Sequence, residues 1–517
     1  CRARATYVSP VTRTWCSIAR LVTARTVIGY PQRHVIELMR AILVLTILTT
    51  LVADADARQL RGSISSEARY VELRPMRRDT VDSAQVVIDD SGRRSFEGRP
   101  VFCVAQTCTF YRPDNVEHAI ALAHDFSLAA WTRHVEGLSA HLYLRSRQNL
   151  AGDFTWPRSD DAFDAVLAFA EFARERYRVR LGRQRSLTGL GFYSFDGVTG
   201  WYQGPAWLTV EAYAGRSLAR ALEEPRHEAL RPIESFIPNR EAWLFGAATE
   251  VQSGPAFGAS LRYQREIWSD RAALVSERAS IDVRSTMLRF FTVEAAADYD
   301  VAYNQIGKAH LTLHRNLLDN RLSVDLTGRR YLPFFELWTI WGVFSPVPYH
   351  ELELQSAWRA SQRVAVEARV GLRRYSDADA AVFIAPAADV SRRLALRTAM
   401  RVNDAVNVGV EYQLETGFGA FLSSGEASAT WTHDDRWRAS LYATAFQQIL
   451  EFRTGEAAVF GIGASSAFHL RSDLEVSADA ALYRQGFDNR PSAVDWTQRR
   501  ASLALVWRFG RDPGIVQ

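Results

Sequence analysis

Lysine is nearly absent from this chain. Lys308 is the only lysine among 517 residues, so almost every positive charge belongs to an arginine. An arginine stays charged at any working pH and can bind a carboxylate through two hydrogen bonds at once. The formal net charge is only +4, which argues against a nucleic-acid surface extending over the whole chain. We therefore expect no nucleic-acid partner.

Catalytic signatures are also missing. The chain has no G-x-S-x-G elbow, no H-E-x-x-H pair and no P-loop, since Gly307-Lys308 lacks the upstream glycine. His310 and His314 share a strand face with Lys308, but at that spacing they lie about 13 Å apart, too far to hold one metal ion. We predict that the protein is not an enzyme, needs no cofactor or metal, and uses these residues on a polar face.

Long apolar runs are limited to one, residues 41–53. It is too short for a transmembrane helix, which needs about 20 residues. Met39 and Arg40 precede the run, and Ala-Asp-Ala at 55–57 follows it, as in a secretory signal peptide. We predict a signal peptide over 39–57, with a membrane anchor as the alternative. Residues 1–38 are interpreted as an over-extended or fragmentary N-terminus.

Cysteine is scarce, with four in the chain. Cys1 and Cys16 precede the predicted cleavage site. Cys103 and Cys108 lie in a polar segment, and no histidine follows Cys108 as a c-type haem site would require. We predict a disulfide across a hairpin, which implies an oxidising compartment such as the periplasm; two independent thiols are the alternative. Residues 58–115 are expected to form an N-terminal strand and a polar loop.

The most informative pattern that is present lies at 174–180. In an extended strand, alternate side chains point to opposite faces. One face here carries Tyr177 and Val179, and the other carries four arginines: Arg174, Arg176, Arg178 and Arg180. Four unpaired charges cannot line a dry core. A strand that is wet on one face and apolar on the other is the unit of a transmembrane β-barrel.

The same alternation recurs along the chain, most clearly at 321–329, 363–373, 405–414 and 473–483. Each segment has about ten residues, the length of a tilted membrane-spanning strand. The gaps between such segments are short in some places and long in others, as in barrels with tight periplasmic turns and larger external loops. We predict an all-β fold, a transmembrane antiparallel β-barrel of roughly 16–20 strands over residues 116–509, located in the cell outer membrane.

Two stretches resemble known proteins. The last predicted strand, 499–509, ends at Phe509 and resembles the final strand of bacterial outer-membrane barrels, whose terminal aromatic residue is read by the assembly machinery. Here a C-terminal tail, 510–517, follows it. Within 180–198, Arg-Leu-Gly-Arg-Gln and then Phe-Asp-Gly resemble a stretch of alginate-export-type porins. In that family it belongs to a basic pore that passes anionic saccharide.

We therefore expect a porin-like channel for small hydrophilic solutes, with anionic solutes as one possibility. The alternative is a structural scaffold barrel that holds a periplasmic or surface partner. The expected partners are outer-membrane lipids, small hydrophilic solutes and the barrel-assembly machinery.

Two sets of residues are candidates for the pore. The first is a set of arginines, which form either a basic constriction or a solvated lumenal wall that facing carboxylates balance. Its members are Arg174, Arg176, Arg178, Arg180, Arg183, Arg369 and Arg373. The second consists of aromatic residues that form either a girdle at the membrane interface or a loop folded into the lumen: Phe334, Phe335, Trp338, Trp341 and Phe344.

Overall fold

The protein is described from a computed structural model. It describes residues 60–74, 76–88, 94–97, 99–132, 135–152, 163–205, 207–218, 242–269, 274–286, 290–332, 348–376, 389–417, 420–449, 457–487 and 496–510. The predicted signal peptide, the aromatic cluster between Phe334 and Phe344, and the tail beyond Gly510 lie outside the described residues.

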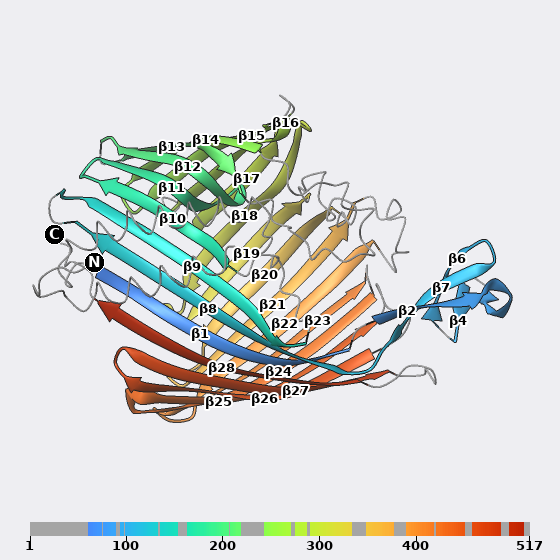
Figure 1. Ribbon diagram of the computed structural model, residues 1–517. Coiled ribbons are helices and arrows are strands. Elements are labelled where there is room, and N and C mark those ends of the chain that lie inside the picture. Colours follow the sequence, from blue (N-terminus) through green and yellow to red (C-terminus); the bar gives the residue numbers. More distant parts are fainter. Residues whose placement is uncertain are drawn as a thin grey trace, which may run out of the picture. The chain divides into compact units, whose positions relative to one another are not determined.

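Twenty-two strands form one antiparallel sheet that closes on itself (Figure 1). Strands neighbouring in the chain pair with each other, except that β1 lies between β28 and β8 and so closes the ring. The strands are β1 (Leu60–Leu73), β8 (Glu117–Trp131), β9 (Leu138–Ala151), β10 (Phe163–Ala173), β11 (Tyr177–Thr188), β12 (Gly191–Gln203), β13 (Leu208–Ser217), β14 (Ala242–Ser253), β15 (Phe257–Trp268), β16 (Leu274–Ser285), β17 (Thr292–Asp300), β18 (Gln305–Leu317), β19 (Leu322–Tyr331), β20 (Tyr349–Arg359), β21 (Val364–Tyr375), β22 (Val390–Arg401), β23 (Val406–Gly417), β24 (Ala420–His433), β25 (Trp437–Ile449), β26 (Ala457–Arg471), β27 (Leu474–Phe487) and β28 (Trp496–Gly510).

The predicted all-β antiparallel barrel is confirmed, and its strand number lies above the expected range of 16–20. The barrel also includes β1, which the sequence placed with the N-terminal segment. Strands such as β17 and β24 carry alanine or other small residues on both faces. Small residues weaken the period-two contrast between faces, so such strands are harder to count from sequence.

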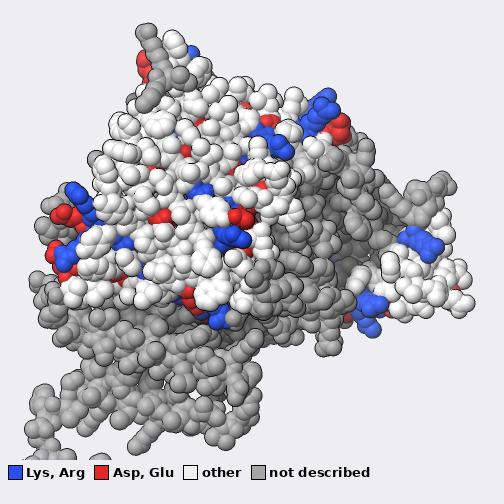
Figure 2. All heavy atoms as spheres, turned by 90° about the horizontal axis from the view of Figure 1, so that it is seen from above, with Lys and Arg blue, Asp and Glu red and all other residues white. Residues whose placement is uncertain are grey.

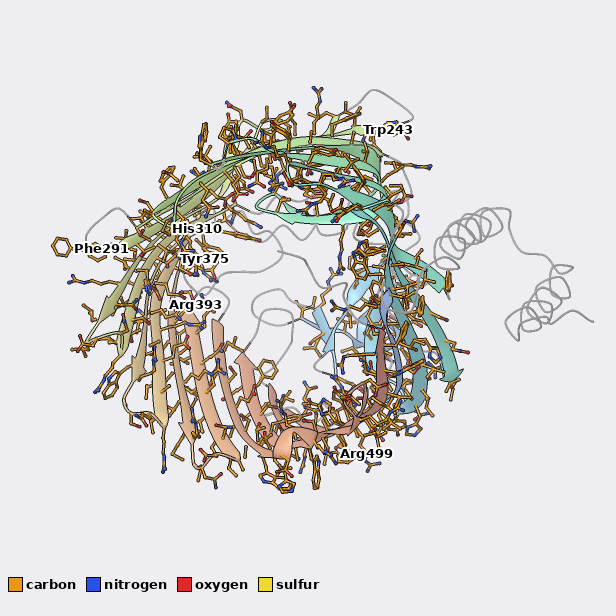
Figure 3. The ribbon with its side chains drawn as sticks, turned by 90° about the vertical axis from the view of Figure 1, so that its left-hand side faces the viewer. Trp243, Phe291, His310, Tyr375, Arg393 and Arg499 are labelled. Atoms are coloured by element: carbon orange, nitrogen blue, oxygen red, sulfur yellow. A yellow bond between two sulfur atoms is a disulfide. The ribbon has the colours of Figure 1, made fainter. Side chains whose placement is uncertain are left out.

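The two faces of the barrel differ as the alternation predicts. Leu352, Val370 and Leu394 lie on outward-pointing positions of neighbouring strands and are exposed. Seen end-on, the strands form a ring, with Tyr375 and Arg393 on its inner side and Trp243 and Phe291 on its outer side (Figure 3). Uncharged residues cover most of the described surface in Figure 2. An apolar outer face on a closed barrel is the solution that a lipid bilayer demands, so the chain is an outer-membrane barrel.

The connections define two ends. At one, here called the turn end, short turns such as 318–321, 360–363 and 402–405 join the strands, and Leu60 and Gly510 lie there as well. At the other, the loop end, the connections include 218–241, 332–348 and 376–389. Among the described residues, no helix is long and apolar enough to cross a membrane.

A small module connects β1 to β8. It contains two three-stranded sheets, one formed by β2 (Met76–Asp82), β6 (Phe102–Val104) and β7 (Thr107–Pro113), the other by β3 (Val87–Ile88), β4 (Arg94–Phe96) and β5 (Arg99–Pro100). A short 3-10 turn, η2 (Ser83–Gln85), links them. The predicted disulfide joins Cys103 on β6 to Cys108 on β7, and Cys108 is fully buried against Phe110 and Val81.

Candidate functional site: the lumenal wall and the infolded hairpin

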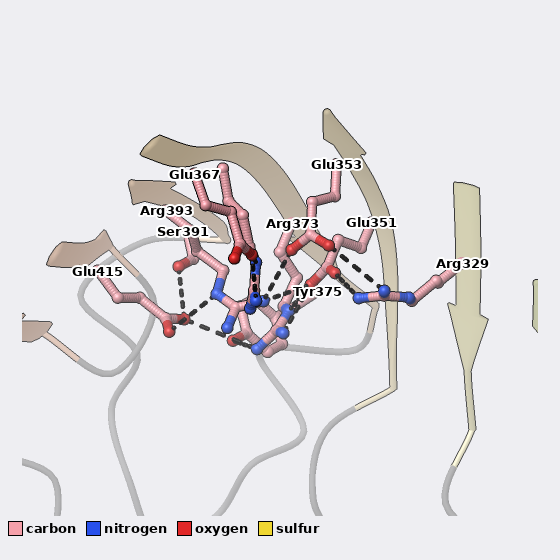
Figure 4. Close-up of polar contacts among 10 residues, drawn as sticks. Arg329, Glu351, Glu353, Glu367, Arg373, Tyr375, Ser391, Arg393 and Glu415 are labelled. Atoms are coloured by element: carbon pink, nitrogen blue, oxygen red, sulfur yellow. Dashed lines mark hydrogen bonds and ion pairs between the residues drawn. The ribbon is translucent and has the colours of Figure 1, made fainter. Parts of the chain in front are cut away.

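A network of charged side chains extends across the lumenal face of β19 to β23 near the loop end (Figure 4). Its members are Arg329, Glu351, Glu353, Arg373, Arg393 and Glu415. We call these six residues the lumenal wall. In the strand register, Glu351 is directly opposite Arg329 on one side and Arg373 on the other, so cross-strand pairing brings opposite charges together.

Glu351 is the centre of this wall. Its carboxylate lies 2.8 Å from Arg329 Nη1, 2.6 Å from Arg373 Nη2 and 3.2 Å from Arg393 Nη1. Arg393 Nε also lies 3.3 Å from Glu415 Oε2, and the Ser391 hydroxyl donates to Glu415 at 2.8 Å. Each carboxylate is therefore held by several donors, so the wall has a fixed geometry.

At the centre of the wall the arginines are more exposed than the carboxylates. The side chain of Glu351 is 0% exposed and that of Glu353 is 11% exposed, whereas Arg329 and Arg393 are 42% and 35% exposed; at the edge the order is reversed, with Arg373 16% and Glu415 29% exposed. A solute near Glu351 therefore meets guanidinium groups first, although the wall contains as many acidic as basic side chains. Salt does not screen the carboxylates, which lie well within a Debye length, so an anion gains mainly from direct contact with the exposed donors.

Three tyrosines border the wall. Tyr331, Tyr349 and Tyr375 are direct cross-strand neighbours, with ring centroids 5.0 Å and 5.8 Å apart along the row. The guanidinium carbon of Arg373 lies 4.0 Å from the Tyr349 ring centroid, and Lys308 Nζ lies 5.6 Å from that of Tyr331. Such cation–π contacts orient the cations.

A second feature occupies the lumen: the tip of the β11–β12 hairpin folds inward. Pairing of β11 with β10 ends at Arg183, and pairing of β12 with β13 ends at Phe195, so the residues between them leave the wall. Arg278 on the lumenal face of β16 donates to the Leu190 carbonyl at 2.7 Å and to the Tyr193 hydroxyl at 3.2 Å. Figure 3 shows pale green strands of this region inside the ring.

The infolded hairpin is firmly packed. Leu190, Tyr193 and Phe195 form a buried cluster with Tyr213 on β13 and Leu244 on β14. Arg278, which contacts Leu190 of this cluster, also pairs with Asp298 at 2.7 Å; the two side chains are 7% and 5% exposed. A buried ion pair of this kind is fixed in place by its hydrogen bonds. The hairpin therefore narrows the lumen as part of the folded structure.

Glycines allow the hairpin to bend. Gly182, Gly197 and Gly215 are cross-strand neighbours on β11, β12 and β13. Gly182 has φ of 122°, and a Cβ there would lie 2.3 Å from the Ala168 carbonyl oxygen. A Cβ at Gly197 would lie 2.1 Å from the Ala214 carbonyl oxygen. The strands thus approach more closely than any residue with a side chain permits.

Residues 180–198 make this bend. Besides the two glycines they include Arg183, whose Nε lies 2.9 Å from Asp196 Oδ1. Gln184 is 1% exposed, donates to the Gly197 carbonyl at 3.1 Å and accepts from the Thr199 hydroxyl at 2.8 Å. Arg183 and Asp196 form a cross-strand pair three positions along the strands from the lumenal pair Arg180 and Thr199. The register therefore places Arg183 on the outer face with Val179 and Leu181, contrary to its expected place in the pore, because it lies an odd number of residues from Arg180.

The expected arginine ladder is shorter than the sequence indicated. Strand β11 begins at Tyr177, so Arg174 and Arg176 lie in the β10–β11 turn, where Arg174 pairs with Glu136 at 2.7 Å. Strand β10 extends to Ala173, so residues 174–176 are needed for the turn and cannot begin the next strand. Arg178 and Arg180 remain on the lumenal face.

Aromatic rings hold both lumenal arginines of this strand. The guanidinium carbons of Arg178 and Arg180 lie 5.2 Å and 5.1 Å from the Trp201 ring centroid. Arg180 also pairs with Glu171 at 2.7 Å. The two candidates on β21 share the face of Arg393 through the strand register: Arg369, which pairs with Glu367 at 2.8 Å, and Arg373 in the wall. That these residues line a conducting pore stays a prediction.

Sequence reasoning missed most of the lumenal wall. The pore candidates predicted from the sequence include Arg373 but not Arg329, Arg393 or the three tyrosines. The signal was available, since Glu351 and Glu353 alternate with Leu352 and Leu354 on β20. What the sequence does not contain is the register that brings these residues beside arginines from β19, β21 and β22.

The described residues contain no cluster of three or more histidine, cysteine, aspartate or glutamate side chains that could hold a metal ion. No family model matches the chain, and no curated protein matches it by sequence.

Solved structures are similar at the level of overall shape. OccAB4 of Acinetobacter baumannii is 8% identical, with a TM-score of 0.37, covering 88% of this chain and 100% of that chain. OpdQ of Pseudomonas aeruginosa is 11% identical, with a TM-score of 0.36, covering 87% and 99%. The siderophore receptor PirA of Pseudomonas aeruginosa is 10% identical, with a TM-score of 0.48, covering 87% and 80%. Likenesses this distant identify no solute.

Proposed function

We propose that this barrel is an outer-membrane channel that passes small hydrophilic solutes and favours anionic over cationic ones. The observation that carries the proposal is the lumenal wall, in which exposed guanidinium groups of Arg329 and Arg393 lie over the buried carboxylate of Glu351. Charged side chains at close quarters select ions in pores. The infolded hairpin supports the proposal, because a narrower lumen brings solutes within reach of these groups.

The resemblance of 180–198 to alginate-export-type porins suggests anionic saccharides as the first solutes to test. Two chemical features of the lumen suit them. Guanidinium groups bind carboxylates bidentately, and the row of Tyr331, Tyr349 and Tyr375 offers flat apolar faces beside them.

The test is the reversal potential of the purified protein in a planar bilayer under a potassium chloride gradient. We expect the sign for chloride preference, and a larger preference at low salt, because the Debye length grows from about 10 Å at 0.1 M to about 30 Å at 0.01 M. Replacing Arg329 and Arg393 by glutamine should shift the reversal potential toward zero or toward cations.

The matched control removes the same charge elsewhere. Arg321 and Arg363 are exposed residues in turns at the opposite end of β19 and β21. Their replacement by glutamine should leave the reversal potential unchanged. Cation preference in the wild-type protein would overturn the anion preference while leaving the channel itself in place. Equal shifts in both variants would show that the lumenal wall is not its cause.

A second candidate function, a scaffold barrel that holds a surface or periplasmic partner, is favoured by the small module. Val87, Ile88, Phe102 and Val104 are each more than half exposed there, and clustered exposed apolar residues mark partner sites. Conductance separates the two functions, since a pure scaffold would insert into bilayers without conducting.

A further inference from the structure

Four basic side chains form a row on the outer face of the barrel at the loop end. Arg330, His350 and Arg374 are direct cross-strand neighbours on β19, β20 and β21, and Arg392 follows on β22. All four are exposed. Neighbouring strands lie about 4.8 Å apart, so the positive groups are close together. We call these four residues the outer basic row.

The outer basic row has no acidic counterpart on its own surface. The outward positions of β19 to β22 contain no aspartate or glutamate, and the row holds their only charged or titratable side chains. No described acidic side chain pairs with any of the four. The lumenal arginines on the same strands, by contrast, have carboxylate partners. Closely spaced arginines without an acidic neighbour among the described residues repel each other, so this surface attracts anions.

The row borders apolar surface on the membrane side. Leu352, Leu372 and Leu394 occupy the next outward positions on their strands and are each more than 40% exposed. At the turn end of the same strands the outward residues are uncharged, for example Trp358, Val364 and Met400. The charge is therefore confined to one edge of the apolar band.

A groove of about 630 Å³ begins at this row. Arg330 and His350 contribute to its lining, together with Ala295, Ala297, Ala309 and Gly328 on β17, β18 and β19. These small side chains lie at outward positions between larger ones such as Ile281 and Leu311. The groove is therefore mostly apolar, with Arg330 and His350 at one end; His310, Arg329 and Glu351, whose positions belong to the lumenal face, also border it.

We propose that the outer basic row and this groove bind a phosphate-bearing anionic lipid, with the phosphate at Arg330 and His350, where the groove begins, an acyl chain in the groove, and Arg374 and Arg392 adding positive charge beside the headgroup. Arginine forks match phosphate oxygens bidentately. Long basic side chains reach from apolar surface to the level of lipid headgroups. In outer-membrane barrels the long loops face outward, so the lipid belongs to the outer leaflet.

The test is native mass spectrometry of the detergent-solubilised barrel, titrated with phosphatidylglycerol or with phosphatidylcholine of the same acyl chains. We expect more bound phosphatidylglycerol than phosphatidylcholine. The triple variant Arg330→Gln, Arg374→Gln, Arg392→Gln should weaken phosphatidylglycerol binding by roughly fivefold per removed cation, since each basic residue near an anionic surface contributes about that factor. The control Arg321→Gln, Arg359→Gln, Arg363→Gln removes equal charge at the turn end and should bind as the wild type does.

A second pair of variants tests the groove. A Cβ added at Gly328 meets no atom within 4 Å, and Gly328 and Ala309 both line the groove at outward positions, so Gly328→Leu with Ala309→Leu should fill the groove without disturbing the lumenal wall. We expect weaker binding of long-chain phosphatidylglycerol and unchanged binding of inorganic phosphate.

Three results would overturn the proposal. Equal binding of phosphatidylglycerol and phosphatidylcholine would show that the charge of the headgroup does not matter. An equal loss of phosphatidylglycerol binding in the row variant and in the turn-end control would show that the outer basic row is not the binding site. Full competition by inorganic phosphate, with no effect of filling the groove, would identify an anion site that does not bind lipid.

Discussion

At the scale of single residues, the fold depends on positions where a side chain cannot be accommodated. Gly182 is the clearest, because it combines a positive φ with a neighbouring carbonyl 2.3 Å from the place of a Cβ. The sequence did not predict this role of Gly182, since a bend between strands leaves no periodic signal. The position of Arg183 on the outer face follows from strict alternation after Arg180, but Arg183 was grouped with the lumenal arginines by its charge alone.

Replacing Gly182 by alanine should destabilise the barrel by about 1–3 kcal/mol, the usual cost of a strained backbone position. The measurement is the temperature at which the folded protein loses its compact mobility on a semi-native gel. Gly200→Ala is the matched control on the paired strand β12, because a Cβ there meets nothing within 4 Å. Equal behaviour of the two variants would show that the glycine row does not constrain the bend.

At the scale of elements, alternation predicted where the clearest strands lie. The predicted segments 363–373, 405–414 and 473–483 correspond to β21 (Val364–Tyr375), β23 (Val406–Gly417) and β27 (Leu474–Phe487). The infolded hairpin was not predictable in the same way. The hydrogen bond from Arg278 to the Leu190 carbonyl, here called the hairpin anchor, joins residues 88 positions apart in the chain. The sequence around either residue does not specify that contact.

The hairpin anchor yields a prediction of its own. Arg278→Met should leave Asp298 without its buried partner, and breaking such a pair costs about 3–5 kcal/mol. The tip should then detach from β16, which widens the lumen and frees the backbone at Arg185, whose side chain is already exposed, for cleavage by trypsin.

The readouts are single-channel conductance and cleavage after Arg185, both of which should increase. Arg284→Met is the control on the same face of β16, since the Arg284–Glu294 pair is largely exposed and exposed pairs contribute little. A folded Arg278→Met variant with wild-type conductance and no new cleavage would show that the Arg278 contacts do not hold the tip.

At the scale of the whole molecule, the sequence was sufficient to predict a barrel but not to predict which side chains meet in its lumen. The outer face contacts only lipid across the membrane, so the residues at its outward positions there are apolar. The lumenal face must satisfy water, ions and its own charges, and many arrangements do so. Which arginine meets which carboxylate depends on the register of 22 strands, and a shift of one residue moves every side chain to the other face.

The most direct test of the account is the single-channel conductance of the purified wild-type protein in a planar bilayer. The proposed channel, a closed barrel whose lumen is narrowed by the β11–β12 hairpin, should give discrete, reproducible conductance steps in symmetrical salt. Protein that is folded by its gel mobility and inserted in the membrane, yet gives no steps, would contradict the channel and favour the scaffold.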